Sequence, residues 1–231
     1  MQKLAITWLG HSAFLLRTPG GQRLLLDPWF TGNPRFPEGA TPKTVDLILI
    51  SHGHSDHITD VAPMAKATGA PVVGIFEITS WLGAKGVQHL EPMNKGGSIT
   101  LKGLRITMTD AKHSSSFDEG GNVYLGEPAG FVIRLEDGRT IYYAGDTSLF
   151  GDMKLIAELY RPDIAFLPIG DRFTMGPDTA AIAARWLGVR QVVPMHWGTF
   201  PLLTGTPDDL REALAGTDIE VLELRPGETA E

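Results

Sequence analysis

The chain contains no cysteine in its 231 residues. A disulfide framework, a thiolate metal ligand and a thiol nucleophile are therefore all excluded. Any metal ion must be bound through nitrogen and oxygen, which histidine and the carboxylates supply. The absence of this one residue type already restricts the chemistry that we expect.

Basic residues are few and scattered along the chain. Lys and Arg number 20 against 27 Asp and Glu, so the formal net charge is −7. Because no basic block could follow a phosphate-rich polymer, we do not expect a nucleic acid as a partner. A small-molecule substrate is expected instead, and a homo-oligomer is compatible with the sequence.

Long hydrophobic runs are also lacking. No apolar stretch approaches the roughly 20 residues that cross a bilayer. The first residues lead straight into a strand pattern, without the apolar segment and cleavage site of a signal peptide. We therefore expect a cytoplasmic protein that does not bind a membrane. A hydrophobic fraction of 42% is ordinary for a globular protein with a core.

Short apolar runs, turns and amphipathic segments follow one another along the chain. The pattern predicts a helix from an N-cap at Thr59 to about Thr68, and a last helix opened by Thr206 and Pro207. Residues 113–128 are expected to be irregular, with a closing strand at 219–224. Other strands are expected at 3–9, 12–18, 23–26, 45–50, 71–75, 98–101, 104–109, 129–135, 140–144, 163–168 and 191–195. This order suggests two similar halves, each a sheet backed by helices, in one domain spanning 1–231.

The most informative segment is Ser51-His52-Gly53-His54-Ser55-Asp56-His57. It directly follows the apolar run 45–50, whose composition is that of a strand covered on both faces. Imidazole and carboxylate together form the ligand set of zinc, iron and manganese. A buried strand that ends in this segment would direct several ligands at one point.

Three further residues of the same types follow the ends of other predicted strands. Taken alone, His113 would be an ordinary surface or core histidine, and Asp146 an ordinary turn residue. Ligands in α/β folds, however, collect at the carboxyl edge of the sheet. Two metal ions that share one carboxylate would use seven ligands, and two ions about 3.5–4 Å apart can hold a bridging hydroxide. The seven candidates are His52, His54, Asp56, His57, His113, Asp146 and His196.

The motif His-x-His-x-Asp-His after a hydrophobic strand, with the later His113, Gly145-Asp146 and Met195-His196, resembles the metallo-β-lactamase-fold superfamily. The resemblance covers essentially the whole chain. It implies an α/β fold in the form of a four-layer αββα sandwich. It also implies that one metal ion is held by His52, His54 and His113, that a second is held by Asp56, His57 and His196, and that Asp146 bridges the two.

Two segments near the start of the chain narrow the resemblance. Residues 8–14, Trp-Leu-Gly-His-Ser-Ala-Phe, and residues 26–29, Leu-Asp-Pro-Trp, resemble small bacterial metal-dependent hydrolases similar to L-ascorbate-6-phosphate lactonase. That lactonase is associated with manganese and much of the wider superfamily with zinc, so both cofactors stay open. The lack of cysteine disagrees with the β-lactamase classes that use a Cys ligand.

We therefore expect a dinuclear metal-dependent hydrolase, in which a metal-bridging hydroxide attacks a small ester, lactone or phosphodiester. Asp56 is expected to ligate metal and to orient the nucleophile. His11 is expected to support the metal edge or contact substrate, although a turn histidine that bonds the backbone is an alternative. Two other functions on the same fold are a metal-holding binding or sensor protein and a redox enzyme with one iron. The complete ligand set favours two metals and hydrolysis.

Three further residues carry smaller expectations. Metal-bound imidazoles usually donate their second N–H to a carboxylate or carbonyl, and either Asp27 or Asp46 could accept it. Both are otherwise expected to be structural. His89 is expected not to be a ligand.

Overall fold

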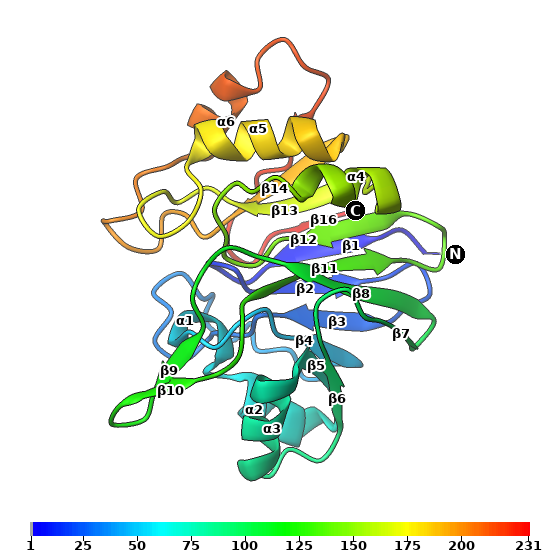
Figure 1. Ribbon diagram of the computed structural model, residues 1–231, viewed down its shortest axis with the longest axis vertical. Coiled ribbons are helices and arrows are strands. Elements are labelled where there is room, and N and C mark those ends of the chain that lie inside the picture. Colours follow the sequence, from blue (N-terminus) through cyan, green and yellow to red (C-terminus); the bar gives the residue numbers. More distant parts are fainter. Residues whose placement is uncertain (1) are drawn as a thin grey trace.

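Two seven-stranded sheets form the centre of the computed structural model, which describes residues 2–231. Helices cover the outer side of each sheet (Figure 1). The ring of Phe14 in the first sheet lies 4.9 Å, centroid to centroid, from that of Phe166 in the second, in an edge-to-face contact. Buried apolar side chains from both sheets form one continuous cluster. These layers are those of the αββα sandwich that the sequence resemblance implies.

The first sheet combines antiparallel and parallel pairing. Its order is β16-β1-β2-β3-β4-β5-β6, antiparallel from β16 to β3 and parallel from β3 to β6. The strands are β1 Ala5–Trp8, β2 Phe14–Arg17, β3 Arg23–Leu26, β4 Leu47–Leu49, β5 Val72–Ile75, β6 Leu90–Met93 and β16 Thr229–Ala230.

The second sheet repeats that arrangement. Its order is β15-β14-β13-β12-β11-β8-β7, antiparallel from β7 to β12 and parallel from β12 to β15. The two halves are therefore similar, as the order of elements in the sequence suggests. The strands are β7 Ser98–Leu101, β8 Leu104–Asp110, β11 Ala129–Arg134, β12 Thr140–Tyr143, β13 Ile164–Pro168, β14 Gln191–Met195 and β15 Glu220–Val221.

Six helices are described between residues 2 and 231, and each outer layer has its own set. The helix α3 packs against β5 and β6, and α5 packs against β13. As predicted, Thr206 opens the last helix with a capping box, because its hydroxyl and the Asp209 carboxylate satisfy each other's backbone N–H groups. No helix within 2–231 is both long and apolar enough to cross a membrane. The helices are α1 Ser55–Ile58, α2 Val61–Thr68, α3 Phe76–Ala84, α4 Met153–Tyr160, α5 Pro177–Leu187 and α6 Pro207–Ala213.

The start of the helix predicted at Thr59 is wrong. The motif itself forms the short helix α1, which ends before Thr59, and α2 then begins at Val61. Asp60 precedes α2 but makes no capping bond, because its carboxylate accepts hydrogen bonds from the backbone of Phe30 and Thr31. Asp60 therefore fixes the loop after β3 against the turn between α1 and α2.

Other differences lie at strands that are short or at an edge. The stretch predicted to be irregular contains a hairpin, β9 Ser116–Asp118 and β10 Asn122–Tyr124. Strand β6 includes Pro92, which an edge strand tolerates because one side of it needs no partner. The closing strand is limited to Glu220–Val221.

Candidate metal centre

The seven predicted ligands come together at one edge of the sandwich. Strand β4 ends just before the motif at 52–57. Strand β12 ends just before Asp146, and β14 ends just before His196. His113 follows β8, which runs in the same direction as β12 because both are antiparallel to β11. The carboxyl ends of these strands therefore meet, which is why residues distant in sequence become neighbours.

Three imidazoles form the first group. The Nε2 atom of His52 lies 3.1 Å from Nδ1 of His54, and Nε2 of His113 lies 3.2 Å from the same atom. One ring nitrogen from each of the three lies within 4.8 Å of the other two. Three nitrogens that converge in this way can hold one divalent metal ion.

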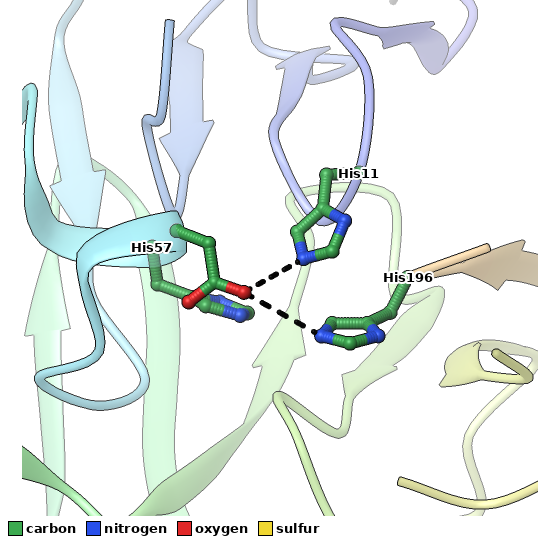
Figure 2. Close-up of side chains that lie close together, drawn as sticks. His11, His57 and His196 are labelled. Carbon is green, nitrogen blue, oxygen red and sulfur yellow. Dashed lines mark hydrogen bonds and ion pairs between the residues drawn. The ribbon is translucent and has the colours of Figure 1, made fainter. Parts of the chain in front are cut away.

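The second group contains a carboxylate and several imidazoles. Figure 2 shows that His11, His57 and His196 lie close together, and these three residues form one group of possible ligands with Asp56. Oδ2 of Asp56 lies 3.1 Å from Nε2 of His11 and 3.8 Å from Nε2 of His196. This group can hold a second ion, and it includes His11 beside the three predicted ligands.

Asp146 lies between the two groups. Its Oδ2 atom is 3.0 Å from Nε2 of His196 and 3.3 Å from Nε2 of His57. The same oxygen is 3.7 Å from Nε2 of His113 and 3.9 Å from Nε2 of His52. One carboxylate oxygen thus faces imidazoles of both groups, which is the position that a shared ligand requires.

Three buried atoms of the predicted ligands lack a hydrogen-bond partner: Nε2 of His57, Oδ1 of Asp146 and Nδ1 of His196. A buried polar atom left unpaired is costly, and a divalent ion at this centre would satisfy the first two atoms. The donors are imidazole nitrogen and carboxylate oxygen alone, a set that zinc and manganese accept. The residues present therefore fit a divalent metal.

Asp27 orients the second group from behind. Oδ2 of this fully buried carboxylate lies 2.8 Å from Nδ1 of His57 and accepts a hydrogen bond from the Tyr143 hydroxyl at 2.7 Å. The backbone and the hydroxyl of Ser51 also donate to it. With its Nδ1–H bound in this way, His57 keeps the Nε2 lone pair directed at the centre.

Of the two aspartates that could fill this role, only Asp27 does. Asp46 instead forms an ion pair with Arg23 at the surface, with 2.9 Å between its Oδ2 and Arg23 Nε. His89 is exposed and belongs to neither group.

The charge state of the centre follows from burial and from the two carboxylates. Burial lowers the pKa of His52, His54 and His113, which leaves neutral imidazoles. Burial acts in the same direction on His196, but the adjacent Asp146 carboxylate outweighs it and raises the pKa to about 9. The pKa of His57 is raised well above its usual value for the same reason. Without metal, two imidazolium groups therefore balance the carboxylates.

His11 combines both roles considered for it. Its carbonyl accepts hydrogen bonds from the Trp8 indole and from the backbone of His196, as in a turn histidine. Its ring nevertheless enters the centre, where Nε2 meets Asp56 and Nδ1 lies 2.9 Å from the Thr199 hydroxyl. Burial lowers the pKa of His11 to about 3. A neutral ring can donate from Nε2 to Asp56 and accept from Thr199 at Nδ1.

Two aromatic side chains flank the centre beside His11. The rings of Trp29 and Phe200 lie 5.1 Å and 5.8 Å from the His11 ring, centroid to centroid. Phe200 is partly exposed, whereas Trp29 is buried. Together they form an apolar wall on this side of the centre.

Comparison with known proteins gives one consistent result. Residues 22–197 match the Beta-lactamase superfamily domain. A UPF0173 metal-dependent hydrolase of Solibacter usitatus is 54% identical over 225 residues, which cover 97% of this chain and 98% of the relative. Another, from Rubrobacter xylanophilus, is 50% identical over 228 residues, with 96% and 94% covered.

A solved structure is similar along almost the whole chain. Igni18, a metallo hydrolase from the archaeon Ignicoccus hospitalis, superposes with a TM-score of 0.88 at 36% sequence identity. The alignment covers 98% of this chain and 97% of Igni18.

Proposed function

Because the chain belongs to the beta-lactamase superfamily and is a metal-dependent hydrolase, we propose that it works with two divalent ions on a small ester, lactone or phosphodiester. The position of Oδ2 of Asp146 carries the proposal of two ions. It faces both groups of imidazoles, which a single ion would not require. The resemblance of residues 8–14 and 26–29 to L-ascorbate-6-phosphate lactonase supports a lactone as one possible substrate.

Each ion would have its own ligands. His52, His54 and His113 would hold the first, and Asp56, His57 and His196 the second. Asp146 would be shared between them. Zinc or manganese bound there would supply Lewis-acid activation of the substrate and make a water molecule more acidic.

The residues around the second group would handle the proton. The Asp56 side chain is 26% exposed, so it reaches the open side of the centre. Its Oδ2 would accept a proton from the attacking water and return it to the leaving group. His11, donating from Nε2, would hold that carboxylate in place, and the Thr199 hydroxyl would fix the His11 ring. Asp56 is thus the proposed catalytic carboxylate and His11 its positioning partner.

Charge and surface support a small substrate. The net charge of −7 disfavours nucleic acid. The wall formed by Trp29 and Phe200 would exclude water beside the reacting bond. We also propose that the protein acts in the cytoplasm, without a membrane partner.

Two measurements test this function. Protein stripped with a chelator and reloaded with zinc, manganese or iron should bind about two ions per chain, as elemental analysis would report. The reloaded protein should then hydrolyse members of a panel of lactones, esters and phosphodiesters. His54→Ala should abolish hydrolysis, whereas His89→Ala serves as the matched control because His89 is outside both groups.

The outcomes separate the alternatives. One iron per chain with redox activity would support the mononuclear oxidoreductase instead. Two tightly bound ions with no turnover on any panel member would support a metal-holding binding or sensor protein. Full hydrolysis by stripped protein would overturn the mechanism.

A further inference from the structure

A cleft of about 450 Å³ lies between α1, α2, α3 and strand β9. Ile58, Pro63, Trp81 and Phe117 give it a mainly apolar wall. None of its lining residues belongs to either group of candidate ligands. The volume is within the range of about 300–1,000 Å³ that is usual for small-molecule sites.

The hairpin β9–β10 forms one wall of this cleft and is fastened to α3. The rings of Phe117 and Trp81 lie 5.3 Å apart, centroid to centroid. Glu119 accepts a hydrogen bond from the Trp81 indole and pairs with Lys85, whose ammonium lies 4.3 Å from the centre of the Trp81 ring. The cleft is therefore built by specific contacts rather than left open between mobile side chains.

The same hairpin is tied to the loop that carries the metal ligands. The backbone of Gly53 donates a hydrogen bond to the Ser115 hydroxyl at 3.0 Å. A Cβ at Gly53 would lie 2.7 Å from the Leu125 side chain, so only glycine allows this close approach. Ile58, which lines the cleft, directly follows His57. Phe117, which also lines the cleft, follows His113 by four positions, so two of the segments that form the cleft also carry candidate ligands.

The charge at the cleft is not balanced. Lys85 is paired with Glu119, whereas the Lys66 ammonium has no ion pair or side-chain hydrogen bond among residues 2–231. One free ammonium above an apolar floor is complementary to a molecule with an apolar body and a single anionic group. Attraction of an anion at this point is notable in a chain whose net charge is −7.

We propose that this cleft binds the non-reacting part of the substrate, an apolar chain that ends in a carboxylate or phosphate at Lys66. The substrate is then an anionic amphiphile whose hydrolysable bond lies at the opposite end, over the metal centre. The role of the bound molecule as a substrate rests on the proposed function. The binding of an anionic amphiphile in the cleft does not depend on that function.

Binding to chelator-treated protein tests the cleft without hydrolysis. Octanoate, octyl phosphate and octanol would be titrated by calorimetry into the wild type and three variants. The two anions are expected to bind at least about tenfold more tightly than octanol, since only they can pair with Lys66. The stronger of the two anions identifies the headgroup.

The variants divide the cleft into its apolar and charged parts. Ala62→Phe would fill the cleft and should remove binding. Lys66→Glu should weaken anion binding about tenfold or more and leave octanol binding unchanged. Lys43→Glu is the charge-matched control, because Lys43 is exposed and lies outside the cleft. Far-ultraviolet circular dichroism and the thermal unfolding midpoint would verify that each variant is folded.

Several results would overturn the proposal. They are equal binding of octanol and the anions, wild-type binding weaker than about 1 mM, or unchanged binding in folded Ala62→Phe or Lys66→Glu. In the metal-loaded protein, Lys66→Glu should raise KM for esters with an anionic tail more than for neutral esters. Hydrolysis without binding in the cleft would contradict only this proposal, and binding without hydrolysis would contradict only the proposed function.

Discussion

Nδ1 of His57 lies 2.8 Å from Oδ2 of Asp27, and both side chains are fully buried. The contact joins two segments that are 30 residues apart in sequence. In the neutral ring it keeps the proton on Nδ1, and it leaves the Nε2 lone pair directed at the centre once the second proton has left. Asp27 therefore acts on the centre through the His57 ring.

Replacing Asp27 by asparagine should weaken metal binding. The amide introduced by Asp27→Asn can offer its N–H₂ to Nδ1 and so favour the wrong tautomer of His57. We expect metal affinity to fall about 10- to 100-fold, measured by competition with a chelating dye. Asp46→Asn is the matched control, because Asp46 pairs with Arg23 at the surface, and such a pair contributes about 1 kcal/mol or less. Equal affinities in the two variants would contradict this role of Asp27.

Sequence alone could place the candidate ligands at strand ends, but it could not decide between Asp27 and Asp46 as the residue that supports them. The apolar run 45–50 ends at the motif, and the largely apolar run 191–195 ends at His196. The end of each strand can therefore be recognised from the local sequence. The contact of Asp27 with His57 depends on the parallel pairing of β3 with β4, a long-range feature with no local pattern. Its one sequence signal is that Asp27 directly follows a buried strand, as the ligands do.

The short elements escaped prediction for a different reason. Strand β6 contains Glu91 and Pro92, residues that local propensity assigns to loops, and it is stabilised by its pairing with β5. The hairpin β9–β10 depends on the contact of Phe117 with Trp81 on α3. In both cases tertiary contacts, rather than the local pattern, select the structure.

Asp146→Asn should reduce the number of bound ions from about two to about one. The substitution keeps the size of the side chain but removes the charge that faces both groups. We expect kcat/KM to fall at least about a thousandfold, since the shared ligand positions both ions. Elemental analysis and steady-state kinetics would check this, with His89→Ala as the control. Two ions and near-normal kinetics in the variant would rule out a bridging role.

His11 should make the metal-free protein sensitive to acid. Its pKa is lowered by burial from 6.5 to about 3, so the folded state stays neutral where the unfolded chain takes up a proton. The free energy of unfolding should therefore be unaffected above pH 6.5 and fall as the pH drops from 6.5 towards 3, by at most about 5 kcal/mol from this group. Urea unfolding at pH 7 and at pH 4 measures this change in the free energy of unfolding.

The matching variant for this test is His11→Gln, which cannot take up the proton but can still donate to Asp56. It should lose less stability than the wild type between the two pH values. His89→Gln, which alters an exposed histidine, should behave as the wild type. Parallel losses in His11→Gln and the wild type would show that other groups cause the acid sensitivity.

Metal binding should release protons near neutral pH. In the metal-free protein Asp146 raises the pKa of His196 to about 9 and, together with Asp56, raises that of His57, so both imidazoles are charged at pH 7. A metal ion takes the Nε2 lone pair only after the proton leaves. Calorimetry in buffers of different ionisation enthalpy should therefore detect about two protons released per chain at pH 7. Metal affinity should rise with pH, and the part of this rise that comes from His196 should end near pH 9, where His196 loses its proton unaided. His196→Gln should release about one proton fewer at pH 7, and heats that do not depend on the buffer would contradict the charged state of both histidines.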